Sequence, residues 1–364
     1  MIEKEFPGFI DVHVHFRDPG MSDAETRATG SAAAAAGGFA SVVTMPNTTP
    51  AGDNEGWIRE QIEDETLPVL ILPSACITKG RQGKEVANLE SLAQAGASFF
   101  TDDGSYVVDD KVMSEAMKRA AKLDIAICEH AMDPRLVANG VIRDCEIARR
   151  FSLPTIPAEA ECAAIRRDIS ICRDTGCRLH IQHISTAQGV ELVHEARKEG
   201  LPVTAEATPH HLLLCCEEIP ADDANFKMAP PLGTREDRAE LRKAVKEGLL
   251  MFATDHAPHP AKTKSCGFAK SANGIIGLEC AIPITYKVMV EEEGMSIEDW
   301  AALWWKMPRE ILSRSAAERH EKFSRNTKIT IGQKKKVDLS SFKSLSRNCP
   351  YGEMEFDCWP IAQS

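Results

Sequence analysis

The sequence lacks the features that would place this chain in a membrane or on nucleic acid. Among its 364 residues no apolar run reaches ~18 residues, the length that a membrane-spanning helix needs. The first residues, MIEKEFPGF, lack the apolar core of a signal peptide. A formal net charge of −11, with one dense basic cluster at Lys334–Lys336, argues against a nucleic-acid surface. We therefore expect no membrane and no nucleic acid among its partners.

A disulfide framework and a zinc ribbon are excluded in the same way. The twelve cysteines are scattered along the chain, and no two of them form a CxxC pair. Without a signal peptide, this usage predicts reduced thiols and a cytoplasmic location. Hydrophobic residues make up 43% and charged residues 27%, as in ordinary globular proteins. The length suits one large α/β barrel or two ordinary domains.

Short β-branched, apolar runs alternate with segments of helical periodicity. Eight strands are predicted, at 8–14, 40–45, 68–75, 97–102, 125–130, 178–184, 202–207 and 249–255. Helices are predicted at 23–38, 111–122, 158–174 and 234–248, the first with Asp23 at its start. Strands that are apolar throughout are typical of parallel sheets buried on both faces. Eight such units predict a (β/α)₈ barrel, with a doubly wound open sheet as the alternative.

The position of the polar residues favours the barrel. Six of them fall at or just past the carboxyl ends of different predicted strands: His13, His15, Asp103, His130, His183 and Asp255. In a closed barrel those ends converge on one rim, whereas an open sheet would spread them along a line. The barrel is expected over residues 7–310. A small β appendage, half-built or complete, is expected at 325–345, with short strands and a Gly turn, and 346–364 is expected to be a tail.

Each of these polar residues has an ordinary structural explanation when taken alone. His13 and His15 point to the same face of a strand, but a lone HxH is also a common strand end. His130 and His183 would serve as hydrogen-bonded core or rim histidines, and Asp255 as a helix N-cap. Asp103 precedes Gly104 and would suit a turn. Their joint occurrence, four imidazoles and two carboxylates at separate strand ends, suits Zn²⁺ and related ions.

These motifs resemble the amidohydrolase superfamily, and specifically the dihydroorotases of the long bacterial type. The matching pieces, which run from Pro7 to about Val337, are PGFIDVHVHFRDPG, TMPNTTP, FFTDDG, EHAMD, HIQHIST, ATPHH, FATDHAPH and GIIGLE. HVHFRDPG with MPNTTP and DHAPH separates such chains from dihydropyrimidinases and allantoinases, which have a similar metal site. The resemblance implies reversible, zinc-dependent hydrolysis of the cyclic amide of dihydroorotate to N-carbamoyl-aspartate, in pyrimidine biosynthesis.

The resemblance also implies a role for each matching residue. His13, His15 and Asp255 would hold one metal, and His130 and His183 a second. Many relatives bridge the two metals with a carboxylated lysine, but ASFFTDDG contains no lysine, and Asp103 stands at the matching position. One or two Zn²⁺ per chain are expected, with two favoured; if Asp103 is only a turn residue, one metal would bind. Asp255 would also be the catalytic acid and base. The residues implied for the substrate are Arg17, Asn47 and His259 for its carboxylate, and the backbone at Asn273 and Gly274 for its ring.

Elementary chemistry agrees with part of this assignment. The guanidinium of Arg17 is a planar fork of donors that matches a carboxylate, although a surface ion pair with Asp18 is its ordinary alternative. Two positions depart from the family pattern, Ala229 where Asn is usual and Asn273 where an aromatic residue is common. Other cyclic amides, namely dihydropyrimidines, hydantoins or allantoin, are therefore an alternative substrate class.

A third hypothesis is a non-catalytic dihydroorotase-like subunit that scaffolds aspartate transcarbamoylase. Such subunits have lost metal ligands, whereas every ligand position is filled here. The expected partners are the anionic substrate, a second copy of the chain in a homodimer, and aspartate transcarbamoylase.

Overall fold

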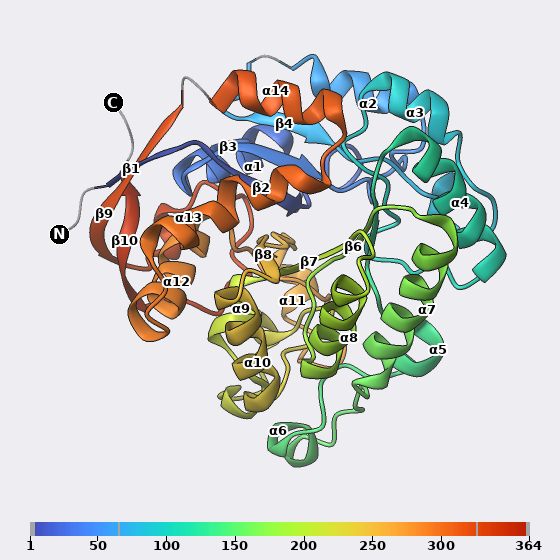
Figure 1. Cartoon of the computed structure of the whole chain (residues 1–364). Coiled ribbons are helices and arrows are strands. Elements are labelled where there is room, and N and C mark those ends of the chain that lie inside the picture. The colour runs from blue at the N-terminus through green and yellow to red at the C-terminus, as the bar shows by residue number, and fades with distance from the viewer. Residues whose placement is uncertain (1–3, 65, 325–326, 362–364) are drawn as a thin grey trace.

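A parallel β-barrel surrounded by helices forms the body of the molecule (Figure 1). This computed structural model describes residues 4–64, 66–324 and 327–361. One parallel sheet has the order β2-β3-β4 and a second has the order β5-β6-β7-β8. The seven strands are β2 (Phe9–Val14), β3 (Phe39–Thr44), β4 (Leu70–Pro73), β5 (Ile127–Glu129), β6 (Leu179–Ile181), β7 (Val203–Ala207) and β8 (Leu250–Phe252).

Single bridges join the two sheets into a closed barrel. Phe100 pairs with Ala75, just after β4, and with Ile127 of β5. It therefore takes the place of the strand that an eight-stranded barrel needs between β4 and β5. On the other side Val14 pairs with His256 beyond β8. The predicted (β/α)₈ barrel is therefore confirmed, and the open sheet is wrong. The strand predicted at 97–102 is reduced to these bridges, because the chain turns at Asp102 to enter the site.

The helices lie outside the barrel and largely agree with the periodicity. They are α1 (Arg27–Ala36), α2 (Glu55–Ile62), α3 (Leu89–Ala95), α4 (Asp110–Leu123), α5 (Pro134–Val137), α6 (Glu146–Arg150), α7 (Glu159–Thr175), α8 (Ala187–Lys198), α9 (Pro209–Leu213), α10 (Arg235–Lys246), α11 (Ala261–Lys264), α12 (Ala281–Thr285), α13 (Ile297–Trp305) and α14 (Arg314–Ser324). Helix α1 begins later than predicted, because Thr26 and Thr29 form a capping box and Asp23 does not cap it.

A tryptophan-rich layer packs helix α13 against the strands. Trp304 lies 5.2 Å from Phe39 of β3 and 5.1 Å from Phe252 of β8, measured between ring centroids. The indole N–H groups of Trp300 and Trp304 both donate to the Thr285 hydroxyl, at 3.1 Å. Burying two indoles with their polar atoms paired stabilises the packing of α13 against β3 and β8.

A three-stranded antiparallel sheet stands beside the barrel, next to α12 and α13 (Figure 1). Its order is β1-β9-β10, with β1 at Lys4–Pro7, β9 at Lys328–Lys336 and β10 at Glu355–Ile361. The prediction of short strands that turn at a Gly in this region is wrong, since one strand, β9, continues through Gly332. Strands β1 and β10 lie outside the predicted range 325–345, and β10 lies in the predicted tail. The predicted domain boundaries stay predictions. No helix of the described residues is both long and apolar enough to cross a bilayer.

Candidate metal centre

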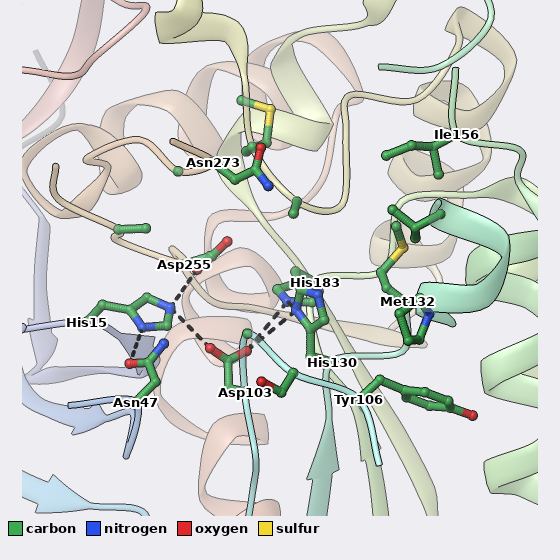
Figure 2. A pocket seen from close by; sticks show the side chains of 18 of the residues that line it. His15, Asn47, Asp103, Tyr106, His130, Met132, Ile156, His183, Asp255 and Asn273 are labelled. Atoms are coloured by element: carbon green, nitrogen blue, oxygen red, sulfur yellow. Dashed lines mark hydrogen bonds and ion pairs between the residues drawn. The ribbon is translucent and has the colours of Figure 1, made fainter. Parts of the chain in front are cut away.

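Figure 2 shows five of the six histidines and aspartates predicted at strand ends converging on one rim of the barrel: His15, Asp103, His130, His183 and Asp255. The sixth, His13, has its Nε2 atom 3.2 Å from Oδ1 of Asp103. The six residues come from β2, from the turn after Phe100, and from the ends of β5, β6 and β8. Their side chains are almost fully buried, with the largest exposed fraction, 11%, at His130. The barrel therefore brings together every predicted ligand: His13, His15, Asp103, His130, His183 and Asp255.

One set of ligand atoms belongs to β2 and the end of β8. The Oδ1 atom of Asp255 lies 3.0 Å from Nε2 of His15 and 3.6 Å from Nε2 of His13. These three atoms lie within 4.8 Å of one another, close enough for a single ion to contact all three. The alternative role of Asp255 as a helix cap has no support, because the residues that follow form no helix until α11.

A second set lies at the ends of β5 and β6, with Asp103 between the two sets. Nδ1 of His130 and Nε2 of His183 approach to 2.8 Å, and each lies 3.7 Å from Oδ1 of Asp103. The same carboxylate reaches the first set, with Oδ1 at 3.2 Å from Nε2 of His13 and Oδ2 at 3.3 Å from Nε2 of His15. Asp103 therefore has the position that a bridging ligand needs.

The buried polar atoms of this cluster fit a divalent cation. Nε2 of His13 and Oδ1 of Asp103 have no hydrogen-bond partner although neither reaches solvent. Burial disfavours ionised carboxylates, yet the neighbouring His13 and His15 hold the pKa of Asp103 well below its usual range. Burial also disfavours an imidazolium, but Asp103 and Glu206 raise the pKa of His13 well above its usual value. A metal at Nε2 of His13 would take the place of that proton and compensate the carboxylates.

Glu206 of β7 is a site residue that the sequence reasoning missed. Its Oε1 lies 2.5 Å from Nδ1 of His13 and accepts the backbone N–H of His183 at 3.2 Å, while Oε2 lies 2.9 Å from Nε2 of His180. Burial alone would raise its pKa, but His13 and His180 lower it to about 2. The carboxylate thus fixes the ring orientation of His13. An acidic residue inside the buried run PVTAEA was the only signal in the sequence.

Asn47 supports the other histidine of the HxH pair. Nδ1 of His15 lies 2.9 Å from Oδ1 of Asn47, which leaves Nε2 facing the carboxylates. Asn47 also lines the cavity described below, so it contacts both the metal centre and the space for a substrate.

Three residues of the site have left-handed backbone conformations that side chains rarely adopt. The φ angles are +60° at Arg17, +35° at His183 and +49° at Asp255. Such conformations cost on the order of 1–3 kcal/mol each and persist where the surrounding structure enforces them. Six other non-glycine residues among those described also have a positive φ, so the strain at these three positions supports a functional rim only together with the convergence of the side chains.

A cavity of about 370 Å³ opens onto the metal centre. Its polar end is lined by Arg17, Asn47 and His259, and its apolar wall by Tyr106, Met132, Val137, Val141 and Ile156. Ala229, Asn273 and Gly274 also line it. All the residues predicted to bind substrate therefore face the same space as five of the six predicted metal ligands, the exception being His13.

Arg17 is buried at the polar end, so its predicted alternative, a surface ion pair with Asp18, is wrong. Its Nε donates to the carbonyl of Pro258 at 3.2 Å, and Nη2 lies 3.4 Å from Nε2 of His259. Asp18 instead accepts a hydrogen bond from the backbone N–H of Arg27. Burial lowers the pKa of Arg17 to about 10, and burial together with Arg17 lowers the pKa of His259 to about 3. At neutral pH the pair is thus a guanidinium cation beside a neutral imidazole.

The backbone groups of Gly274 are already paired within the protein. Its N–H donates to the carbonyl of Lys227 at 3.0 Å, and its carbonyl accepts from Nζ of Lys264 at 2.8 Å and from Nδ2 of Asn348 at 3.0 Å. The carbonyl of Asn273 accepts from Nε2 of His259 at 2.7 Å. Gly274 is therefore placed to touch a ligand by packing, with its hydrogen bonds used to hold the wall.

Comparisons with known proteins agree with this geometry. A family model described as "Dihydro-orotase-like" matches residues 5–189. The dihydroorotase of Geobacillus sp. strain WCH70 is 42% identical over 363 residues, covering 97% of this chain and 84% of that protein. The dihydroorotase of Bacillus caldolyticus is 41% identical, covering 98% and 84%.

Solved structures show the same fold at lower identity. The L-hydantoinase (dihydropyrimidinase) of Arthrobacter aurescens superposes with a TM-score of 0.81 at 23% identity, covering 99% of this chain and 83% of that one. The dihydroorotase of Saccharomyces cerevisiae, solved with 5-fluoroorotic acid, gives 0.77 at 18% identity, covering 99% of both chains.

Replacing the carboxylate behind His13 should weaken metal binding without removing a ligand. We expect Glu206→Gln to lower metal affinity about 10- to 100-fold, because the amide no longer supplies the charge that orients and polarises the imidazole. A chelator competition titration measures the change. Equal thermal unfolding midpoints of the metal-free proteins would show that the fold is intact. An affinity equal to that of the unaltered protein would mean that Glu206 is only a core residue.

Proposed function

The chain belongs to the dihydroorotase family, and from this premise we propose that it catalyses the reversible hydrolysis of dihydroorotate to N-carbamoyl-aspartate in pyrimidine biosynthesis. The family relationship rests on relatives about 40% identical over almost the whole chain. The observation that carries the substrate assignment is one cavity that joins a His/Asp cluster to a buried guanidinium. A cyclic amide bearing a carboxylate needs both features: the His/Asp cluster to open the ring and the guanidinium to hold the carboxylate.

We propose two Zn²⁺ ions per chain as the cofactors. His13, His15 and Asp255 would hold one ion, His130 and His183 the other, and Asp103 would contact both. Imidazole and carboxylate donors of this kind suit zinc. When bound, zinc would provide a nucleophile from water at neutral pH and stabilise the negative charge that develops on the oxygen of the amide carbonyl under attack.

Asp255 is proposed as the residue that moves the proton. In the ring-opening direction a C–O bond to water forms and the amide C–N bond of the ring breaks. The carboxylate of Asp255 takes one proton from the water and delivers it to the leaving nitrogen, and closure runs the same steps in reverse. Hydrogen bonding to His15 and the charges of His13 and His15 lower the pKa of Asp255 despite its burial, so it begins the reaction ionised.

The polar end of the cavity is proposed to hold the substrate carboxylate. Arg17 would provide the charge and its forked donors, and Asn47 and His259 would flank it. The backbone at Asn273 and Gly274 would contact the ring, and Ala229 lines the same cavity without a side-chain hydrogen bond to offer. Ring-opening assays on dihydroorotate, dihydrouracil, a hydantoin and allantoin test the substrate assignment, and preference for a ring without a carboxylate would overturn it. A homodimer and an aspartate transcarbamoylase partner stay predictions.

Removing the Asp255 carboxylate should stop the reaction. We expect kcat to fall about 10²- to 10⁴-fold in Asp255→Asn and Asp255→Ala when metal is supplied in excess, the range for the loss of a general acid and base. Steady-state rates in both directions, with metal content measured on the same samples, check this. Near-full activity of Asp255→Ala would exclude the proposed proton path.

Removing the Arg17 guanidinium should weaken substrate binding and leave the metals in place. We expect Arg17→Met to raise KM for dihydroorotate roughly 10- to 100-fold, since a charge-assisted hydrogen bond is lost. Arg17→Lys is the matched control, because it keeps the charge and loses the fork. Metal analysis accompanies the kinetics; loss of metal, or an unchanged KM, would mean that Arg17 has a structural role.

A bridging Asp103 predicts a metal centre that assembles without carbon dioxide. Since no lysine carbamate has to form, the metal-free protein should regain activity with zinc in bicarbonate-depleted buffer. Asp103→Ala should bind fewer zinc ions per chain than the unaltered protein, as elemental analysis measures. Reactivation that depends on bicarbonate, or an unchanged zinc content in Asp103→Ala, would contradict the bridge.

A further inference from the structure

The chain after β9 crosses the rim of the barrel before it forms β10. The segment 343–348 is anchored there by two buried glutamates. Glu279 accepts the backbone N–H groups of Lys343 and Ser344 at 2.7 and 3.2 Å, and Glu25 accepts that of Leu345 at 2.9 Å. Both carboxylates belong to the barrel, so the segment is fixed to the same rim that carries the metal centre.

Asn348, at the end of this segment, is hydrogen-bonded to the loop that follows β8. Its Oδ1 accepts the backbone N–H of His259 at 3.1 Å. Its Nδ2 donates to the carbonyls of Ala257 and Gly274, both at 3.0 Å. Its own carbonyl accepts the N–H of Ile276 at 2.9 Å. With an exposed fraction of 4%, the side chain competes with little water for these partners.

The three residues that Asn348 holds, Ala257, His259 and Gly274, all line the cavity. A primary amide offers one acceptor and two donor hydrogens, and here all three are used. Ala257 and His259 lie in the first part of the segment that follows β8 and Gly274 lies in its later part, so the single side chain links the two.

His259 in turn lies beside Arg17. With Nε2 of His259 at 3.4 Å from Nη2 of Arg17, a shift of the loop would move the imidazole relative to the guanidinium. The hydrogen bonds of Asn348 reach none of the six proposed metal ligands directly, and Asp255, two residues before Ala257, is held by its own contact with His15. Its influence should therefore be confined to the substrate end of the cavity.

We propose that Asn348 is a positioning residue for the carboxylate-binding end of the site: through three hydrogen bonds it holds His259 and the Ala257 and Gly274 walls at the distance that the substrate requires. This proposal rests on the proposed function, and it assigns the segment before β10 a part in substrate binding. Losing the amide leaves the Ala257 carbonyl and the His259 N–H short of a partner and leaves the Gly274 carbonyl with Lys264 alone, so the loop would shift to find others.

The experiment compares Asn348→Ala and the isosteric Asn348→Asp with the unaltered protein. We expect KM for dihydroorotate to rise about 10- to 100-fold, with a smaller change in kcat and an unchanged metal content, because the loop is displaced while the metal centre is not. The Asp variant keeps the volume and an acceptor for His259 but presents a carboxylate to two carbonyls, so it should fail as well. Ser346→Ala, in the same segment as Asn348, is the matched control. It loses the hydrogen bond from the Ser346 hydroxyl to the carbonyl of Ala24 and should change KM less than about twofold.

A double-mutant cycle with His259→Ala separates positioning from general destabilisation. If Asn348 acts through His259, then Asn348→Ala should change kcat/KM far less in the His259→Ala background than in the unaltered protein. Equal effects in both backgrounds, or a loss of kcat and metal together, would overturn the proposal. The unaltered protein is assayed on dihydroorotate before any variant is made. If it does not open the ring, the proposed function is wrong, and this outcome is distinct from a failure of the proposal for Asn348.

Discussion

The structure depends on keeping three carboxylates buried within one cluster of imidazoles. Asp103, Asp255 and Glu206 are all nearly inaccessible to water, where an uncompensated charge is costly. The imidazoles around them are those of the four predicted ligand histidines and of His180, which contacts Glu206. The carboxylates raise the pKa of His13, while that of His15 is lowered, chiefly by its burial and the charge of Arg17. Protons alone therefore balance the site incompletely, and a divalent cation is the natural compensation. The barrel allows such a cluster because its rim is built from the ends of separate strands, each of which contributes its own side chain.

The barrel closure is part of the same electrostatic arrangement. Asp11 in β2 accepts the N–H and hydroxyl of Thr254 at 3.0 and 2.5 Å, which ties the first strand to the segment just before Asp255. It also accepts the N–H of His13 at 3.1 Å. Two proposed ligands far apart in the sequence, His13 and Asp255, are thus held in register by one buried side chain, through contacts that a strand pairing alone would not provide.

The sequence predicted which histidines and aspartates converge at the rim better than it predicted the residues that support them. His13, His15, His130, His183 and Asp255 follow apolar strands, so strand periodicity and barrel geometry together were enough to bring them to one rim. Glu206 was missed because its partner, His13, is 193 residues away and a single acid in an apolar strand has no local pattern. Asn348 was missed because the segment before β10 has no periodicity, and its role arises only from contacts 74 to 91 residues distant. Residues that act through long-range hydrogen bonds leave little trace in sequence spacing.

The two ends of the cavity explain how an acidic chain would handle an anionic substrate. The net charge of −11 is a sum over the whole chain, whereas Arg17 acts within a few ångströms from a buried position beside the cavity. Burial and the nearby guanidinium keep His259 neutral, so the pair presents one positive charge with additional hydrogen-bonding capacity. A second cation there would repel Arg17, and a carboxylate would neutralise it. The local field is therefore set by the pair of Arg17, which keeps its proton, and His259, which gives its proton up. The loop held by Asn348 determines how close these two groups are.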